Sequence, residues 1–185
     1  MRRTILSEEE IQTICSMIGR QLSSRYRFFD EPPVAICVMN GAIPFASDLL
    51  KNVNIPIIID YIQLSTYRNG ESNGNVIINK DIFTNLQNRD VIIIEDIVDS
   101  GISLNFLTDY IFKKYRPKSI VSVSLISRIS KRKVSVKIDY LGKEIDEDSF
   151  LVGYGLDYKK MFRNERYVFV PSQEEIEEWD KLVKE

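Results

Sequence analysis

"VIIIEDIVDSGIS", residues Val91–Ser103, joins an uninterrupted apolar run to a cluster of acids. The four residues Val91–Ile94 are all β-branched, a composition that favours a strand, and a continuous apolar strand is typical of a parallel sheet buried on both faces. Glu95, Asp96 and Asp99 follow within five positions. The segment therefore predicts a buried strand whose carboxyl end carries three carboxylates.

The turn after these acids has the composition of an anion-binding loop. Ser100 and Ser103 offer hydroxyls, Gly101 is free to adopt a positive φ, and a helix is predicted to begin directly afterwards. A sugar phosphate would satisfy both halves of the segment, because the loop would bind the phosphate while the carboxylates accept hydrogen bonds from ribose hydroxyls. Composition alone is equally consistent with a solvated turn that has a serine N-cap.

The rest of the chain predicts an α/β fold with a central parallel sheet flanked by helices. Expected strands cover 34–39, 55–64, 76–78, 91–96 and 119–127, and expected helices begin at the capping box of Ser7 and Glu10 and cover 43–51 and 103–115. The 185 residues are expected to form one domain, with a core over about 30–130. The N-terminal segment and about 134–185 form a small hood, closed by a helix that begins at Ser172. Ligands of such sheets bind at the carboxyl ends of the strands.

Composition excludes several classes of function. Lys and Arg number 25 against 27 Asp and Glu, so no global charge attracts nucleic acid or an anionic membrane. The chain has no histidine, which excludes Ser-His-Asp catalysis and His-ligated zinc and makes Mg²⁺ the most plausible metal. Cys15 and Cys37 lack metal-ligand spacing, and no signal peptide or membrane span is found, so a reduced, cytoplasmic location is expected.

Two motifs carry a family resemblance. "VIIIEDIVDSGIS" resembles the phosphoribosyl-pyrophosphate signature of the type I phosphoribosyltransferases, and "FLVGYGLDYKKMFRNERYVFV" (Phe150–Val170) resembles their hypoxanthine-guanine, purine-salvage branch. The resemblance implies transfer of the 5-phosphoribosyl group from phosphoribosyl pyrophosphate to hypoxanthine, and also guanine, with Mg²⁺. The products would be IMP or GMP and pyrophosphate. Homodimers or homotetramers are the implied assemblies.

The resemblance assigns the first motif to ribose, phosphate and proton transfer. Glu95 and Asp96 would bind the ribose hydroxyls and could contact Mg²⁺ indirectly, while Asp99 would exchange the proton at N7 of the purine. The 5′-phosphate would be bound by Ser100, Gly101, Ile102 and Ser103.

The second motif would supply the purine and pyrophosphate contacts. Phe150 would stack on the base, a suitable use of a rigid aromatic face, and Leu151 would contact the base edge through its backbone. Asp157 would approach Mg²⁺, partly through water, and Arg163 would donate to pyrophosphate.

Two loops match further parts of the family pattern. In "VMNGA" (Val38–Ala42), the backbone of Asn40 and Gly41 would receive pyrophosphate, and Met39–Asn40 matches a peptide bond that is often cis in the family; the sequence leaves its isomer open. In "STYRNGESNGN", Thr66 and Tyr67 stand where the family has the Ser-Tyr pair of a flexible lid that excludes water.

Arg128 leaves two alternatives open. It stands where the family has a lysine that donates to the purine 6-oxo group, so a xanthine-preferring enzyme is the second interpretation. The third is a non-catalytic regulator that senses phosphoribosyl pyrophosphate and binds nucleic acid through "RISKRK" (Arg128–Lys133), although the near-neutral net charge argues against nucleic acid.

Overall fold

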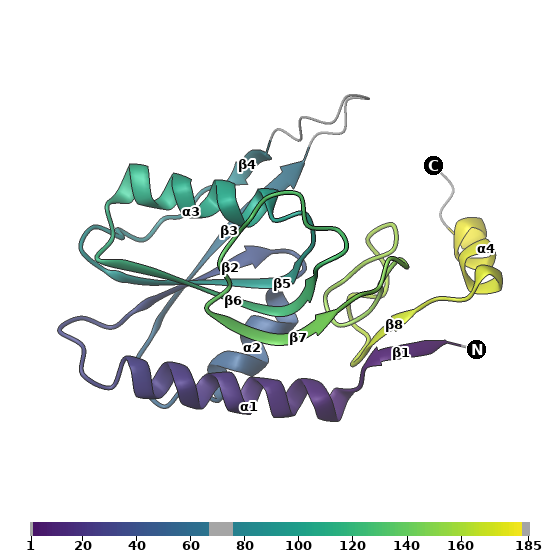
Figure 1. Ribbon diagram of the computed structural model, residues 1–185, viewed down its shortest axis with the longest axis horizontal. Helices are drawn as coiled ribbons and strands as arrows, with labels where there is room; N and C mark the ends of the chain where they lie inside the picture. The colour runs from purple at the N-terminus through teal and green to yellow at the C-terminus, as the bar shows by residue number, and fades with distance from the viewer. Residues whose placement is uncertain (1, 67–75, 183–185) are drawn as a thin grey trace.

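The computed structural model describes residues 2–66 and 76–182 and has a six-stranded central sheet (Figure 1). In spatial order its strands are β4 (Val76–Lys80), β3 (Ile58–Thr66), β2 (Val34–Met39), β5 (Asp90–Val98), β6 (Ser119–Arg128) and β7 (Tyr140–Ile145). Only the β3–β4 pair among them is antiparallel. The predicted α/β fold with a mostly parallel sheet is confirmed.

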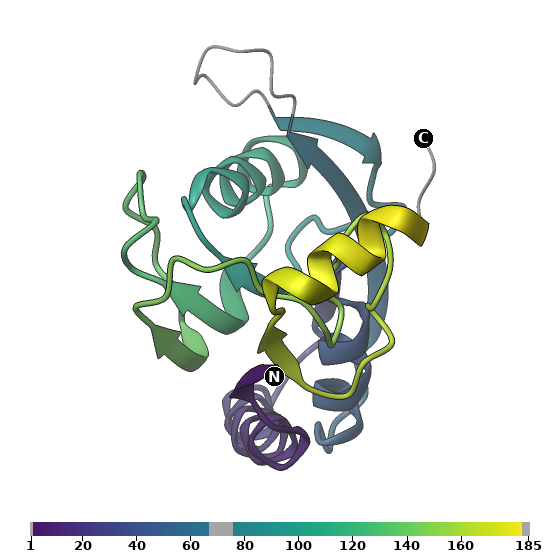
Figure 2. The same ribbon diagram turned by 90° about the vertical axis from the view of Figure 1, so that its right-hand side faces the viewer.

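Helices cover both faces of this sheet (Figure 2). On one face, α1 (Glu8–Arg25) and α2 (Ile43–Lys51) pack on a core cluster that contains inward-facing residues of β2, β5 and β6. On the other, α3 (Ile102–Tyr115) packs on a second cluster. The continuous apolar runs of β2 and β5 follow from this arrangement, because side chains of both orientations are buried.

The predicted starts and ends of elements have local causes. Ser7 and Glu10 form both hydrogen bonds of the expected capping box at α1. The strand predicted at 55–64 begins at Ile58 instead, after Pro56, which has no N–H to donate to a sheet. α3 ends at Tyr115, where Arg116 takes a left-handed conformation ahead of Pro117.

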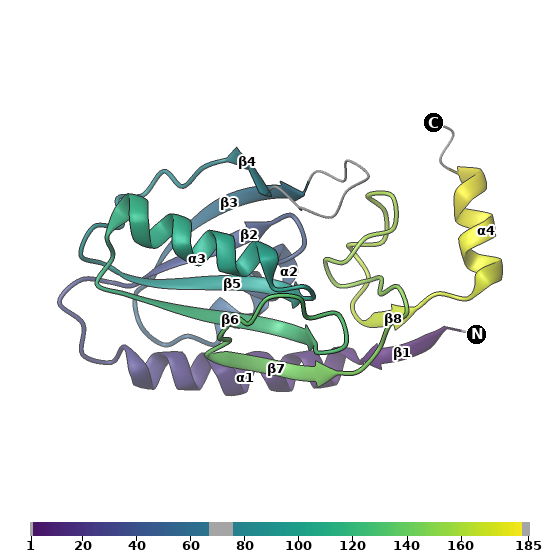
Figure 3. The ribbon, with the colours of Figure 1, turned by 45° about the horizontal axis from the view of Figure 1, so that its top comes forward.

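A second, two-stranded sheet lies beyond the carboxyl ends of the parallel strands. In it, β1 (Arg3–Leu6) pairs antiparallel with β8 (Val168–Val170), and α4 (Gln173–Leu182) follows (Figure 3). Ser172 caps α4, because its hydroxyl accepts from the Glu175 N–H at 3.3 Å. The N-terminal strand and the C-terminal segment from Val168 onward thus meet above the strand ends.

One boundary differs from the prediction. The hood was expected to include all of about 134–185, whereas β7 is the sixth strand of the central sheet and pairs parallel with β6. The alternating apolar and polar stretch Lys133–Gly142 overlaps only the start of β7, which is an edge strand that packs against α1. Within the residues described, no helix is both long and apolar enough to cross a membrane.

Candidate active site

The acid pair at the end of β5 is held in an environment that disfavours negative charge. Glu95 is buried, and this burial, followed by the nearby charge of Asp96, raises its pKa well above the usual range. Burial also raises the pKa of Asp96 to about 6, although the backbone N–H of Ile97 and the charge of Arg163 oppose the shift. A cation or a set of hydroxyl donors at this strand end would lower the free-energy cost of ionising the two carboxyl groups.

Asp99 forms a two-point ion pair with Arg128. The Arg128 Nε donates to Oδ1 of Asp99 at 2.5 Å, and Nη2 donates to Oδ2. The two residues meet because β5 and β6 are parallel neighbours, with Val98 opposite Ser127. Arg128 is 6% exposed, and its Nη1 also donates to the Ser149 carbonyl at 2.9 Å. Arg128 is thus placed against the predicted proton-transferring acid.

The loop between β5 and α3 has the form of the predicted phosphate cradle. Gly101 has a φ of 81° and lies at the N-terminus of α3, and a Cβ there would be 2.6 Å from the Val134 carbonyl. The N–H groups of Lys133 and Val134 both donate to the Ser100 carbonyl at 3.0 Å. A glycine is therefore required at the start of α3, where the Ile102 N–H donates to Ser100 Oγ at 3.3 Å and the helix N-terminus favours an anion.

Arg132 supports this loop and was missed in the sequence analysis. Its Nη2 donates to Ser127 Oγ at 2.6 Å and to the Val98 carbonyl at 3.3 Å, and thus ties together the ends of β5 and β6. Of the basic run, Arg128 therefore contacts Asp99 and Arg132 joins the two strand ends beside it. The signal that could have found Arg132 is a basic residue four positions after a strand end in a tight loop.

The loop after β2 is wedged between two other parts of the site. The Met39–Asn40 peptide, which the resemblance selected as the candidate, is cis. A Cβ on Gly41 would lie 1.8 Å from Oδ2 of Asp96, and a Cβ on Gly155 would lie 1.9 Å from the Gly41 carbonyl. The sequence analysis did not select Gly155, although the "GYG" of the second motif contains it. The close approach of three chain segments explains both glycines.

An ion pair within the hood faces the strand ends. The Arg163 Nη2 lies 2.7 Å from Oδ1 of Asp157, and Nη1 donates to the Gly155 carbonyl at 2.6 Å. The other carboxylate oxygen of Asp157 accepts from the Lys160 N–H at 2.8 Å. Both predicted pyrophosphate-side residues are therefore fixed beside the Gly41 loop.

A cavity of about 210 Å³ joins the two halves of the site. It is lined by Asp96, Ile97, Asp99, Arg128, Phe150, Leu151, Leu156, Asp157 and Arg163. Phe150 supplies the aromatic ring of this lining and is 52% exposed, while Leu151 is buried. The cavity thus combines carboxylates from β5, a guanidinium from β6 and an aromatic ring from the hood.

Some predicted residues lie elsewhere. Glu95 points to the opposite side of β5 from Asp96, as successive strand residues do, and does not line this cavity. Thr66 is the last residue of β3. Tyr67, the other predicted lid residue, lies outside the residues described.

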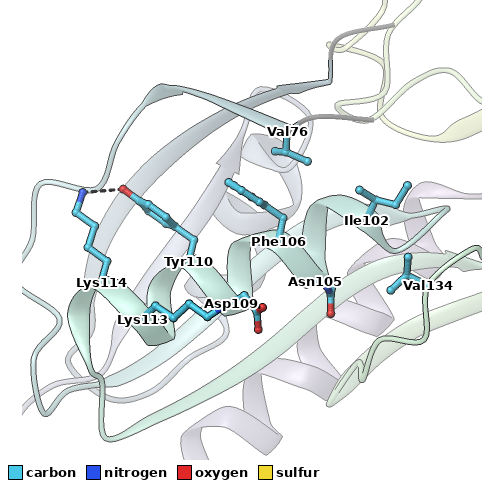
Figure 4. A pocket seen from close by; sticks show the side chains of 9 residues that line it. All are labelled: Val76, Ile102, Asn105, Phe106, Asp109, Tyr110, Lys113, Lys114 and Val134. Atoms are coloured by element: carbon cyan, nitrogen blue, oxygen red, sulfur yellow. Dashed lines mark hydrogen bonds and ion pairs between the residues drawn. The ribbon is translucent and has the colours of Figure 1, made fainter. Parts of the chain in front are cut away.

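A larger cavity of about 700 Å³ lies on the outer face of α3 (Figure 4). Phe106 and Tyr110 stack there with ring centroids 6.1 Å apart, and Lys114 Nζ donates to the Tyr110 hydroxyl at 2.6 Å. Ile102 is the only predicted site residue in its described lining. The smaller cavity, where the predicted residues converge, is therefore the candidate active site.

Comparison with known proteins gives consistent matches. Residues 4–159 match the family model of the phosphoribosyl transferase domain. A hypoxanthine-guanine phosphoribosyltransferase of Bacillus subtilis is 42% identical over 171 residues, which cover 92% of this chain and 93% of the relative. A crystal structure of a hypoxanthine phosphoribosyltransferase from Staphylococcus aureus superposes with a TM-score of 0.86 at 37% identity, covering 93% of this chain and 92% of the other. A Bacillus anthracis hypoxanthine-guanine phosphoribosyltransferase superposes with a TM-score of 0.85 at 35% identity, covering 93% and 99%.

Proposed function

Because this chain belongs to the phosphoribosyltransferase family, we propose that it works in purine salvage. It transfers the 5-phosphoribosyl group from phosphoribosyl pyrophosphate to hypoxanthine and guanine, and releases pyrophosphate with IMP or GMP. The relatives that match over more than nine tenths of the chain carry this activity in their names.

The observation that carries the proposal is the shared cavity between the strand ends and the hood. Asp96 of β5 and Asp99, directly after β5, line one side of it, and Phe150 and Arg163 line it from the hood. A ribose placed over β5 would have a purine-stacking ring and a pyrophosphate-binding guanidinium at the same cavity. This arrangement supports a reaction at C1′ between a base and a pyrophosphate leaving group.

Ribose and phosphate recognition is assigned to the β5–α3 segment. Asp96 accepts hydrogen bonds from ribose hydroxyls, with Glu95 as the second acid of the pair. Backbone N–H groups of 100–103 and the hydroxyls of Ser100 and Ser103 bind the 5′-phosphate at the start of α3. The carboxylates also stabilise the positive charge that develops on the sugar as the bond to pyrophosphate breaks.

Proton transfer is assigned to Asp99. It is held by Arg128 at the cavity and takes the N7 proton of the purine as the new bond to C1′ forms. The two-point contact with Arg128 fixes the orientation of the Asp99 carboxylate at the cavity, which suits a group that must accept a proton at a defined place.

Leaving-group stabilisation is assigned to Arg163 and to the backbone of Asn40 and Gly41. Arg163 donates to pyrophosphate, and the Gly41 loop is close enough to Asp96 for pyrophosphate and ribose to be bound side by side.

The residues fit magnesium held jointly with substrate. Among the described residues, no group of three or more acidic, Cys or His side chains is placed to hold a metal. Mg²⁺ needs only one or two carboxylates when substrate phosphates and water supply its other ligands. Asp157, partly through water, and the acid pair Glu95 and Asp96, whose raised pKa values a cation would lower, are the proposed contacts. When bound, the ion neutralises charge on the pyrophosphate group.

Base recognition is assigned to Phe150, Leu151 and Arg128. Phe150 stacks on the purine and the Leu151 backbone contacts its edge. Three of the five N–H groups of Arg128 donate to Asp99 and Ser149, which leaves two that we assign to the purine 6-oxo group. A second oxo group, as in xanthine, is the alternative acceptor.

Two further properties are part of the proposal. Ile59 and Tyr61 of β3 and Ile77 of β4 are exposed on the α1–α2 face of the sheet, which supports a homodimer or homotetramer. Light scattering of the purified chain tests this, and a monomer at micromolar concentration would exclude it. A cytoplasmic location is proposed from the activity.

The experiment that tests the function is an absorbance assay of initial rate. Phosphoribosyl pyrophosphate and Mg²⁺ are supplied with hypoxanthine, guanine, xanthine or adenine in parallel. Turnover of hypoxanthine and guanine is expected. Turnover of xanthine alone would identify a xanthine-specific phosphoribosyltransferase instead, and no turnover of any base would overturn the proposal. The nucleic-acid regulator loses its support, because Arg128 and Arg132 of the basic run are engaged at the site.

A further inference from the structure

The C-terminal helix α4 carries the only tryptophan of the chain. Trp179 is 6% exposed and packs with Val152 and Phe169 in a hydrophobic cluster of the hood. The helix is also held from the N-terminus of the chain, since Arg2 Nε donates to Glu175 at 2.6 Å. Figures 1 and 2 show α4 as the outermost element, beyond the hood loops.

A row of aromatic rings runs from α4 to the candidate active site. The ring centroids of Trp179 and Tyr158 are 5.6 Å apart, and those of Tyr158 and Phe150 are 5.9 Å apart in an edge-to-face arrangement. Phe150 lines the cavity at the end of this row. Tyr158 is thus the only ring between Trp179 and the proposed purine-stacking ring among the described aromatic contacts.

Polar contacts from the same helix hold Tyr158 in place. The Tyr158 hydroxyl donates to Oδ1 of Asp180 at 2.5 Å, and Lys159 Nζ lies 3.1 Å from the same oxygen. Trp179 also packs on Phe162 with centroids 4.0 Å apart. Therefore α4 contacts the hood turn just after Asp157 and just before Arg163.

We propose that α4 is a positioning element for purine binding, in which Trp179 and Asp180 fix Tyr158 and, through it, the orientation of Phe150. The inference rests on the proposed function, because it needs Phe150 to stack on the base. Phe150 is half exposed, so its ring would lose orientational freedom when a purine binds. An edge-to-face contact that holds the ring beforehand reduces that entropic cost.

The kinetic test compares variants along the row with a matched variant outside it. Trp179→Leu keeps apolar bulk but removes the indole, and Tyr158→Phe removes only the hydroxyl that reaches Asp180. Tyr167→Phe is the control. Tyr167 packs against the same hydrophobic cluster, but its ring contacts Phe169 and its hydroxyl accepts from Arg2, so the substitution removes a hydroxyl outside the row.

The expected result is a selective loss of base affinity. Trp179→Leu raises KM for hypoxanthine about threefold to tenfold, the effect of losing one aromatic contact, and leaves KM for phosphoribosyl pyrophosphate within about twofold. Tyr158→Phe and Asp180→Asn raise KM for hypoxanthine less, and Tyr167→Phe leaves it unchanged. Equal rises in both KM values would indicate general damage to the hood and overturn the inference.

Trp179 fluorescence gives a second readout. IMP is titrated into the enzyme with excitation at the red edge of indole absorption, where IMP does not absorb. Binding is expected to change the emission of wild type and of Tyr167→Phe, and to change that of Phe150→Leu much less at saturating IMP. An emission that is unaffected by IMP in the wild type would contradict mechanical coupling along the row.

The outcomes separate this inference from the function on which it rests. If Phe150→Leu raises KM for hypoxanthine but Trp179→Leu, Tyr158→Phe and Asp180→Asn do not, the positioning role fails and the function stands. If Phe150→Leu has no effect, the stacking role and the inference fail together. If Trp179→Leu does not fold, the other two variants, which leave the apolar packing intact, decide the question.

Discussion

Arg128 and Asp99, 29 positions apart in the chain, form a two-point ion pair at the carboxyl ends of the neighbouring strands β6 and β5. The guanidinium is buried, whereas the carboxylate is partly open to the cavity. Charge-assisted two-point pairs have a fixed geometry, so the pair orients both the proposed base and the proposed 6-oxo donor. A lysine at this position would provide one compact donor group instead of a planar fork.

Arg128→Met is expected to lower kcat/KM for hypoxanthine by about 10-fold to 150-fold, because a charged hydrogen-bond donor to the base is lost. Arg128→Lys restores the donor and should stay within about tenfold of wild type. Lys131→Met is the control. It removes one positive charge three residues further along the chain, from a side chain whose Nζ donates to the Asp148 carbonyl. Parallel rates on hypoxanthine and xanthine check both expectations, and a Met variant as active as wild type would refute the donor role.

Asp99→Asn should lower kcat by roughly 10²-fold to 10⁴-fold, the range for loss of a general base. The dissociation constant for phosphoribosyl pyrophosphate should change far less, because the base does not hold that substrate. Steady-state rates and calorimetric titration of phosphoribosyl pyrophosphate with Mg²⁺ measure the two quantities. An equal loss in both would argue against proton transfer by Asp99.

The acid pair makes the stability of the free chain depend on pH with an unusual sign. The pKa of Asp96 is raised to about 6 in the folded state, so the folded chain binds a proton at Asp96 more tightly than the unfolded chain does. The resulting contribution to the free energy of unfolding is fully present below the unfolded pKa and is lost as pH rises through about 6. Asp96→Asn should therefore stabilise the free chain above pH 6 but not near pH 4.

The size of this effect is limited by solvent. Asp96 is partly exposed, so the gain at pH 8 is expected to be about 1–2 kcal/mol, below the full value of the pKa shift. Thermal unfolding of Asp96→Asn and wild type from pH 4 to pH 8 measures it. Asp81→Asn is the opposite control, because hydrogen bonds, mainly from Lys114, lower the pKa of Asp81 to about 2 despite desolvation, and this variant should lose stability at neutral pH. A gain for Asp96→Asn that did not depend on pH would contradict the assignment.

Gly41→Ala should raise the dissociation constant for phosphoribosyl pyrophosphate by at least about tenfold. A Cβ there would meet Oδ2 of Asp96 at 1.8 Å and push the carboxylate aside. Gly142→Ala is the matched control. A Cβ there would meet the Leu125 carbonyl at 2.5 Å, inside the sheet and away from the cavity, and should lower the melting temperature without a selective loss of binding. Titration of both variants at a temperature where they are folded makes the comparison, and normal binding by Gly41→Ala would show that the loop has room.

Much of the architecture could be predicted from local patterns. The β-branched run of Val91–Ile94, the capping box of Ser7 and Glu10 and the stop at Pro117 each act within a few residues, and β5, α1 and α3 form where they indicate. The family resemblance selected Met39–Asn40 as the candidate cis peptide but left its isomer open, and the structure has it cis. The comparisons confirm the family that the two motifs indicated.

Other features depended on which strands become neighbours. The segment that contains β7 was assigned to the hood because Lys133–Gly142 alternates apolar and polar residues, which suits any half-buried strand. Only pairing with β6 places β7 in the central sheet. Gly155 was missed because its neighbour, the Gly41 carbonyl, lies on a distant segment of the chain. Arg132 was missed because its hydrogen bond to Ser127 depends on how the loop after β6 folds back.

By itself the sequence determined the parallel strands, the acids at the end of β5 and the glycine turn before α3. Hydrophobic periodicity and turn chemistry act over a few residues, so local sequence is sufficient for these features. Only the tertiary structure decided that Arg128 pairs with Asp99, that Gly41 lies against Asp96 and that α4 reaches Phe150 through Tyr158. Those contacts depend on strand order, register and the docking of a distant helix, which are set by burying the whole apolar surface at once.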